Sequence, residues 1–300
     1  MSTFIQQLAN GVSLGSIYAL IALGYTMVFG VLKLINFAHS DVMMVGAYVA
    51  FFVATGLNAG PDPSIASALI TFLAAMAGAA ALGIAIERLV YRPLRSASRL
   101  SLLIAAMGMS LLLEYGGQVV FGPQHRRVPD VITDERIVLG DLNLTVHKLI
   151  ILGVSVVLML GLHFFVNKTR TGTAMRAVSQ NVDAAKLMGV NTDFIIGLTF
   201  AIGSALAGAA GLLVAFHQQG DIDPLMGVYP GLKAFVAAVL GGIGSIYGAM
   251  LGGLLIGVAE TFVAAYLPSS FRDTITFSIL ILVLLVRPAG LLGKFKPEKV

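Results

Sequence analysis

Long apolar stretches without alternation constrain the fold of this chain more than any other feature. Most approach the roughly 20 residues that one helical membrane crossing needs. Only 11% of the 300 residues are charged and 57% are apolar, which leaves too little polar surface for a soluble domain of this size. Because barrel strands would alternate in polarity, the stretches indicate helices. They predict membrane-spanning segments at 11–32, 42–57, 65–86, 101–121, 149–166, 194–216, 231–267 and 275–286.

The stretch 231–267 is too long for one helix and is interrupted by the run GGIGSIYG at 241–248. We interpret it as two short spans, or as one span with a re-entrant half-helix whose backbone is covered by protein or a water-filled cavity. No Lys or Arg precedes 11–32, so we interpret that stretch as a retained span rather than a cleaved signal. The prediction is an all-α, polytopic transmembrane helical bundle of about eight or nine spans. We expect residues 1–300 to form a single membrane-spanning domain.

Loop charge predicts which side each connection faces. The segments 87–99 and 167–193 are rich in Lys and Arg, as is the tail after 286, so the positive-inside rule puts all three in the cytoplasm. The segments 122–148 and 217–227 are mixed or acidic and should face outside. The N-terminus is therefore expected outside and the C-terminus in the cytoplasm.

Glycine makes up 34 of the 300 residues, and small residues recur at steps of four in two of the predicted helices. In lipid, close backbone approach through Gly, Ala and Ser drives helix association. Packing alone is enough to explain any single step. We expect both helices in a tightly packed interior on the strength of Gly203, Ala207, Gly211, Gly244, Gly248, Gly252, Gly253 and Gly257.

Several classes of function find no support in the sequence. The nearest approach to a nucleotide-binding P-loop is GLLGKF at 290–295, where the first glycine is too close and Phe295 takes the place of the hydroxyl residue. We therefore expect no ATP hydrolysis by this chain and no enzymatic activity. Cysteine is absent, the five His lack metal-ligand spacing and no basic stripe exists. We predict no metal, no cofactor and no nucleic-acid partner, with the lipid bilayer as the surrounding phase.

The segment 168–192 carries an amphipathic pattern. Apolar or small residues recur at steps of three and four from Met175 to Gly189, which predicts one helix of about four turns. Thr173 is expected to cap its start and Gly189 to end it. Such a helix either rests on the lipid interface or docks into a groove of a soluble partner.

Charge within the apolar stretches is scarce. Each charged residue at mid-bilayer costs about 2.5–3.5 kcal/mol, so Glu114, Lys233 and Glu260 are notable. An ion-coupled carrier usually needs a polar relay, and the relay here is thin, which favours energy coupling on a partner. Glu260 either makes a structural hydrogen bond to a neighbouring helix or lines a pathway. The polar interruption INFAHSD at 35–41 is either a turn capped by Ser40 or Asp41, or a broken helix facing the pathway.

Three motifs follow one another in INFAHSDVMMVGAY at 35–48, GLKAFVAAVLGGIGSIYGAMLGGLLIGVAE at 231–260 and LLVRPAGLLG at 284–293. In this order they resemble the signatures of branched-chain amino-acid ABC transporter permeases of the high-affinity Liv type. The resemblance covers nearly the whole chain. Ser40 stands where that family usually has Gly, and Tyr247 where Pro is common.

The resemblance implies one permease subunit of an ATP-binding-cassette importer that carries leucine, isoleucine and valine across a bacterial inner membrane. It implies a second, homologous permease, two ATP-binding subunits and a periplasmic amino-acid-binding protein as partners. In such importers a cytoplasmic loop with an E-A-A…G core docks on the ATPase, and 183–189 matches it with Asp in place of Glu. We expect the coupling loop 168–192 to act through Arg176, Gln180, Asp183, Ala184, Ala185, Met188 and Gly189. For the translocation pathway or broken helix we expect Asn36, His39, Gly241, Gly242, Gly244 and Glu260.

Other functions stay open at this level. Relatives with the same motifs carry urea, short amides or other amino acids. A self-sufficient ion-coupled carrier or channel for a small neutral solute is the rival from another class, and a structural membrane scaffold is a weaker one. No charged pair in the sequence is evidently suited to the α-amino and α-carboxylate groups of an amino acid, so we expect the binding protein to set most of the selectivity.

Overall fold

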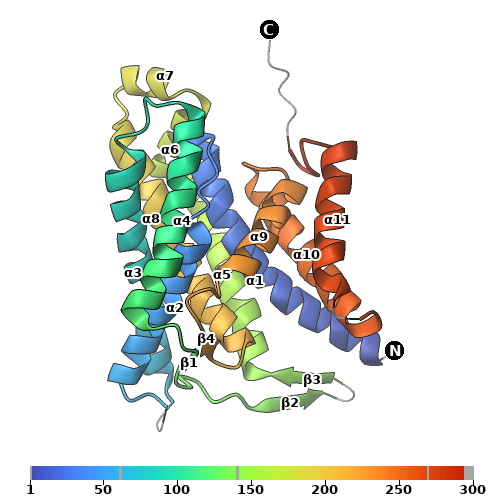
Figure 1. Ribbon diagram of the computed structural model, residues 1–300. Coiled ribbons are helices and arrows are strands. Elements are labelled where there is room, and N and C mark those ends of the chain that lie inside the picture. The colour runs from blue at the N-terminus through green and yellow to red at the C-terminus, as the bar shows by residue number, and fades with distance from the viewer. Residues whose placement is uncertain (1, 61–62, 140–141, 269, 294–300) are drawn as a thin grey trace.

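The computed structural model describes residues 2–60, 63–139, 142–268 and 270–293 (Figure 1). These residues are predominantly helical, in agreement with the predicted class. The helices are α1 (Ser2–Leu32), α2 (His39–Gly56), α3 (Ile65–Ile86), the π-helix η1 (Glu87–Tyr91), α4 (Arg99–Phe121), α5 (Val146–Lys168), α6 (Arg170–Gln180), α7 (Val182–Leu187), α8 (Thr192–His217), α9 (Val228–Gly241), α10 (Ile246–Tyr266) and α11 (Phe271–Val286). The short strands are β1 (Arg126–Arg127), β2 (Arg136–Leu139), β3 (Leu142–Thr145) and β4 (Asp221–Ile222).

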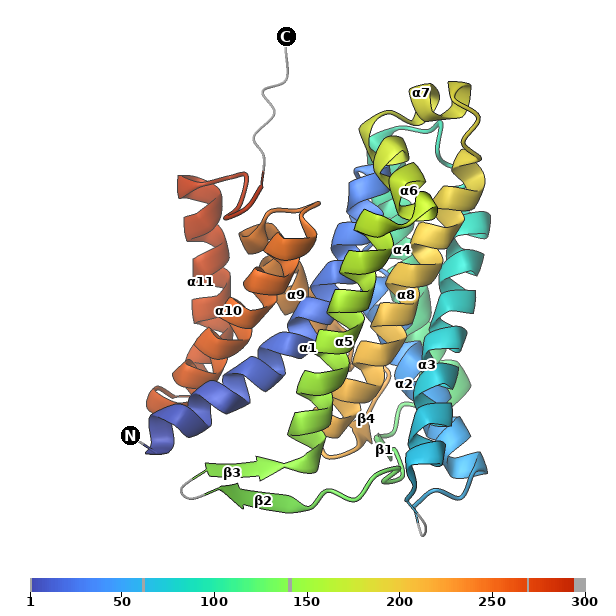
Figure 2. The same ribbon diagram turned by 180° about the vertical axis from the view of Figure 1, so that it is seen from behind.

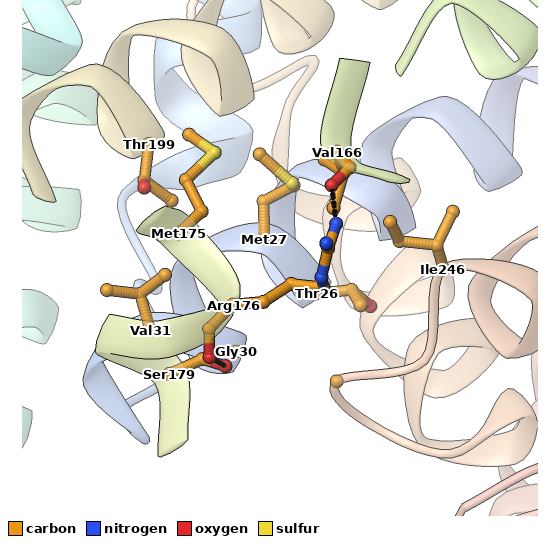
Figure 3. Close-up of a pocket in the computed structure, with 11 residues that line it drawn as sticks. Thr26, Met27, Gly30, Val31, Val166, Met175, Arg176, Ser179, Thr199 and Ile246 are labelled. Atoms are coloured by element: carbon orange, nitrogen blue, oxygen red, sulfur yellow. Dashed lines mark hydrogen bonds between the residues drawn. The ribbon is translucent and has the colours of Figure 1, made fainter. Parts of the chain in front are cut away.

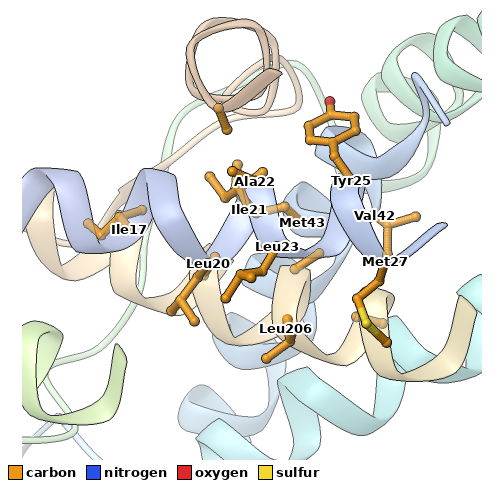
Figure 4. Packing of buried hydrophobic residues seen from close by; sticks show 14 of the residues in the cluster. Ile17, Leu20, Ile21, Ala22, Leu23, Tyr25, Met27, Val42, Met43 and Leu206 are labelled. Atoms are coloured by element: carbon orange, nitrogen blue, oxygen red, sulfur yellow. The ribbon is translucent and has the colours of Figure 1, made fainter. Parts of the chain in front are cut away.

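Six helical segments in the described ranges are long and apolar enough to cross a membrane: α1, α3 continued by η1, α4, α5, α8 and α10. Helix α1 runs through the middle of the bundle and contacts α5, α8, α9 and α10 (Figures 1 and 2). Its side chains from Ile17 to Leu23 are almost inaccessible, and Figure 4 shows part of this stretch beside Leu206 of α8 and Met43 of α2. A helix that is apolar on every side is stable when neighbours enclose it. The first stretch is thus an integral part of the bundle.

Small residues bring the helices together, as the steps of four predict. A Cβ atom on Gly15 of α1 would lie 2.8 Å from the Cα atom of Leu254 in α10, and one on Gly253 would meet the backbone of Ala19. A Cβ atom on Gly208 of α8 would likewise collide with Ala75 in α3, and one on Gly46 of α2 would collide with Gly208. Helix α8 is buried on nearly all sides, whereas α10 is buried mainly along its glycine-rich face. The predicted interior position therefore holds for all of α8 and for one side of α10.

The connections collect at two ends of the bundle (Figures 1 and 2). The Lys- and Arg-rich segments 87–99 and 167–193 lie at the end that carries α6 and α7. The segments 122–148 and 217–227 lie at the opposite end, where β1 pairs with β4 and β2 with β3, both antiparallel. This grouping is the one that loop charge predicts. The third segment predicted to be cytoplasmic is the basic tail, whose Lys294, Lys296 and Lys299 lie outside the described residues.

The stretch 231–267 forms two helices, α9 and α10, with the predicted interruption between them. Gly242 and Gly244 have φ values of +104° and +95°, which L side chains rarely adopt, so glycine is required by the turn. The segment 287–293, here called the C-terminal turn, folds back onto the end of α9. Backbone N–H groups of Leu291 and Leu292 donate to the carbonyls of Leu240 and Gly241 over 2.8 and 2.9 Å. Protein thus satisfies the broken helix's free carbonyls.

The segment 168–192 contains two helices where one of four turns was predicted. Helix α6 ends at Gln180, and Asn181 is extended, with a φ of −157°. The Asn181 side chain accepts a hydrogen bond from the Ala184 N–H and caps α7, so the chain restarts instead of continuing. The predicted N-cap, Thr173, is also wrong, because Thr169 caps α6 by accepting from the Gly172 N–H. Gly189, with a φ of +82°, follows the end of α7 as predicted.

Candidate coupling and translocation sites

Helix α6 packs its apolar face against its own bundle. Gly172, Met175 and Val178 are buried where α6 meets α1, α5 and α8. A Cβ atom on Gly172 would collide with the carbonyls of Phe165 and Val166 at the end of α5, so glycine sets the distance between the two helices. The apolar stripe expected to face either lipid or a partner is therefore largely occupied within the chain. These contacts hold α6 against α1, α5 and α8.

Unlike α6, helix α7 and the residue after it expose apolar side chains at the surface of the chain. Ala185 is buried, but the neighbouring Asp183 and Ala184 are exposed. Helices α6 and α7, with Met188 after them, are here called the α6–α7 arm. Leu187 and Met188 are its most exposed large apolar side chains, at 88% and 83%. Met188 belongs to the predicted coupling set, whereas Leu187 was missed because it lies off the apolar stripe. Its position two residues before Gly189, which ends the helix, was the one signal in the sequence that could have identified Leu187.

An ionic cluster ties the arm to α3. Asp193, at the start of α8, receives Arg95 at 2.5 Å and also pairs with Arg92. Arg95 in turn pairs with Glu87, a buried residue at the start of η1. Asp193 follows the α6–α7 arm in the sequence, so these ion pairs connect the arm to the end of α3. No sequence pattern indicated the cluster, since Asp193 is 98 and 101 residues away from its partners Arg95 and Arg92.

A cavity at the α6 end of the bundle brings two predicted sites together (Figure 3). Arg176 of α6 and Gly244 of the α9–α10 turn both line it, with Thr26 and Met27 from α1. The Arg176 guanidinium donates to the Val166 carbonyl, one of the free carbonyls at the end of α5. Gln180, the other predicted coupling residue of α6, is exposed and does not line this cavity. Coupling arm and broken helix therefore share one cavity.

The polar interruption between α1 and α2 is a buried connection. Asn36 accepts a hydrogen bond from the Tyr91 hydroxyl over 2.8 Å, which links this turn to the end of η1. His39 is fully buried, with its ring 4.8 Å from that of Tyr25 and in the space left by Gly24. The sequence predicts that Ser40 or Asp41 caps α2, but neither side chain does so. Ala38 holds the N-cap position without a side-chain bond.

Glu260 lies in the half of the bundle nearest the strands and belongs to a charged cluster. The Lys233 ammonium donates to Glu260 Oε1 at 2.7 Å and lies 3.0 Å from Asp273 Oδ1. The Tyr18 hydroxyl donates to Glu260 Oε2 at 2.8 Å. The four residues come from α10, α9, α11 and α1, so the cluster joins four helices. Glu260 thus has the structural hydrogen bonds expected under one of its two interpretations.

Long apolar helices, small-residue contacts and buried ionic clusters define a multi-pass membrane protein. A sequence model for the family described as branched-chain amino acid transport system / permease component matches residues 7–286. The chain belongs to this family, which confirms the resemblance seen in its motifs.

Individual relatives agree over nearly their full length. The chain is 45% identical to the high-affinity branched-chain amino acid transport system permease protein LivH of Salmonella typhimurium, over 99% of this chain and 98% of the relative. It is 44% identical to the corresponding permease protein BraD of Pseudomonas aeruginosa, with the same coverage. A probable branched-chain amino acid transport permease protein of Methanocaldococcus jannaschii is 29% identical over 95% of this chain and 91% of its own length.

Proposed function

We propose that the chain is one transmembrane subunit of an ATP-driven importer of branched-chain amino acids in a bacterial inner membrane. It works with a second, homologous permease, two ATP-binding subunits and a periplasmic amino-acid-binding protein. It is a single membrane domain that hydrolyses no ATP itself and receives energy mechanically. The family membership supports the transport role, and the partner set follows from what such a subunit lacks.

The proposed topology has nine crossings, by α1–α5 and α8–α11, with the N-terminus outside and the C-terminus in the cytoplasm. The grouping of basic segments at the α6–α7 end supports this orientation. Helix α9 has 14 residues and covers about 21 Å, less than the hydrocarbon thickness of about 30 Å. The α9–α10 turn is then at membrane depth, which is tolerated because the C-terminal turn covers its backbone.

The observation that carries the proposal is the pair of exposed apolar side chains on α7. Helix α7 lies at the end of the molecule (Figure 1), and Leu187, its last residue, and Met188, which follows it, are both exposed, on an arm whose other face is packed on the bundle. Desolvation of such a pair in a partner's groove gives affinity, while the acidic Asp183 beside it adds orientation. We assign the coupling loop 168–192 to the ATP-binding subunit on this basis.

The mechanism follows from the mounting of the arm. When ATP closes the two motor subunits, α7 moves with them and α6 acts as a short rigid lever. The charges around Asp193 pass the displacement to α3, and the contacts of α6 pass it to α1 and α8. The small-residue interfaces of α8 and α10 let these helices rock and open the pathway alternately. The segments 122–148 and 217–227 receive the binding protein outside.

The test is Leu187→Asp in the reconstituted importer. We expect loss of ATP-dependent leucine uptake with unchanged membrane insertion, because a buried carboxylate would disrupt the apolar contact with the ATPase. Leu100→Asp is the matched control, since it makes the same change at an exposed residue in the first turn of α4, outside the arm and its ion pairs. Ala185→Arg is a poorer probe, because Ala185 is buried and its replacement would disturb the arm itself. Normal uptake by Leu187→Asp would remove the coupling assignment, and gradient-driven leucine flux by the chain alone would favour an ion-coupled carrier.

A further inference from the structure

A polar vestibule opens among α1, α5, α8, α10 and α11 at the strand-bearing end of the bundle. Two adjoining cavities, each of about 350 Å³, share Leu14, His217, Glu260 and Arg272 in their walls and therefore form one space. Pockets that hold small molecules have volumes of about 300–1,000 Å³. Lys148 and Asn10 belong to the first cavity, and Lys233 to the second.

Charge in the vestibule is divided between two sides. Glu260 and Asp273 share the single ammonium of Lys233, so this side carries one formal negative charge in excess. The cations Lys148 and Arg272 line the space without a carboxylate bound to either within ion-pair distance among the described residues. The Lys148 ammonium makes a 2.8 Å hydrogen bond to the neutral side chain of Asn10. A ligand with one negative and one positive group would complement both sides.

Apolar surface lies beside these charges. Leu14 and Ile17 of α1 and Val214 of α8 line the same vestibule, next to Tyr18, whose hydroxyl bonds to Glu260. Lys148 and Arg272 lie in the first turns of α5 and α11, whereas Glu260 lies within α10, where an ionisable residue is costly and is retained mainly for transport or binding roles. A structural ion pair alone needs one cation for Glu260. It does not account for two further cations around an open space.

We propose that this vestibule receives the amino-acid substrate, with the α-carboxylate on Lys148 and Arg272, the α-ammonium on Glu260, and the branched side chain on Leu14, Ile17 and Val214. The proposal rests on the importer function above and adds a substrate site within the permease itself. It departs from the expectation, drawn from the sequence, that the chain has no charged pair suited to both ends of an amino acid. Lys148, Glu260 and Arg272 lie on three different helices, so no sequence window contains them.

The first experiment is substrate protection of a single cysteine, since the chain contains no cysteine of its own. Ala264→Cys places a thiol in the vestibule wall, and Val138→Cys on β2 places one at the same end outside it. The complete importer is reconstituted, and reaction with a charged methanethiosulfonate is timed with and without leucine. If the vestibule binds leucine with a Kd of about 1 mM, about 10 mM leucine slows the Ala264→Cys reaction about tenfold. The Val138→Cys reaction should not change.

Two one-ended analogues test the assignment of charges. 4-Methylpentanoate is leucine without its amino group and isopentylamine is leucine without its carboxylate, so each should protect Ala264→Cys less than leucine at equal concentration. Arg272→Gln and Lys148→Gln, introduced beside Ala264→Cys, should reduce protection by leucine. Arg99→Gln, at the opposite end of the bundle, should leave it unchanged. Glu260→Gln should weaken protection by isopentylamine more than protection by 4-methylpentanoate.

The two proposals fail separately in this design. An importer that takes up leucine with ATP and binding protein, but shows equal labelling with and without leucine, overturns the vestibule alone. Full protection in all three charge variants overturns the assigned contacts. Absence of uptake in the parent importer overturns the proposed function itself.

Discussion

Replacing Lys233 by methionine should destabilise the protein more than replacing Glu260 by glutamine. Without the Lys233 ammonium, the Glu260 carboxylate keeps only the neutral Tyr18 hydroxyl as a partner, at a site that is 5% exposed. Without the Glu260 charge, Lys233 keeps its 3.0 Å contact with Asp273, whose side chain is 48% exposed and partly solvated. The asymmetry follows from one cation serving two carboxylates.

The magnitudes follow from this geometry. Removing one partner of a buried ion pair costs about 3–5 kcal/mol because the other charge stays desolvated, and Lys233→Met should fall in that range. Glu260→Gln keeps two hydrogen-bonding atoms and one remaining ion pair, so its cost should be about 1–3 kcal/mol. The double variant Lys233→Met/Glu260→Leu should cost less than the sum of the single changes, because no charge is left unpaired at Glu260.

The assay is unfolding by SDS titration in mixed micelles, followed by far-ultraviolet circular dichroism because the chain contains no tryptophan. Lys148→Met is the matched control, since Lys148 is half-buried and, among the described residues, its ammonium bonds to the neutral Asn10 side chain and to no carboxylate. It should lower the free energy of unfolding far less than Lys233→Met. A cost for Glu260→Gln equal to or above that for Lys233→Met would refute the reasoning.

Three further predictions concern glycine contacts and topology. Gly15→Ala should lower the free energy of unfolding by about 1–3 kcal/mol, because its Cβ would lie 2.8 Å from the α10 backbone. Gly30→Ala, in open space on the same helix, should raise it by up to about 1 kcal/mol, and the same SDS titration compares the two. Gly290 has a φ of +77°, and a Cβ atom there would lie 2.6 Å from an α9 carbonyl, so Gly290→Ala should release the C-terminal turn and speed its cleavage by trypsin. Gly244 faces open space, so Gly244→Ala should cost only backbone strain of about 1–2 kcal/mol. Lys186→Cys should react with an impermeant maleimide in inverted vesicles, and labelling in intact cells would reverse the proposed topology.

Much of the architecture was predictable from local patterns. The apolar stretches mark the long helices, and the interruption at 241–248 marks the break between α9 and α10. Gly189 marks the end of α7. These features depend on near neighbours in sequence and on lipid as solvent, which requires each span to satisfy its own backbone.

Other features were mispredicted because a competing local interaction prevailed. Asn181 ends one helix and begins the next, since its side chain caps α7 more effectively than the apolar period sustains one helix. At the start of α2, Ala38 occupies the cap position and leaves Asp41 to receive the Ser110 hydroxyl from α4. An interhelical partner of this kind lies outside any sequence window.

The sequence by itself determined that the chain spans a membrane, which segments group at each end, and to which family it belongs. Only the tertiary structure decided which face of α6 is buried, that Leu187 is exposed, and that Lys233 and Glu260 meet. Helix faces and charge pairs depend on how helices rotate and approach one another, and close packing of small residues fixes both over long distances in sequence. The vestibule exists for the same reason, because its charges converge only when α5, α9, α10 and α11 are assembled.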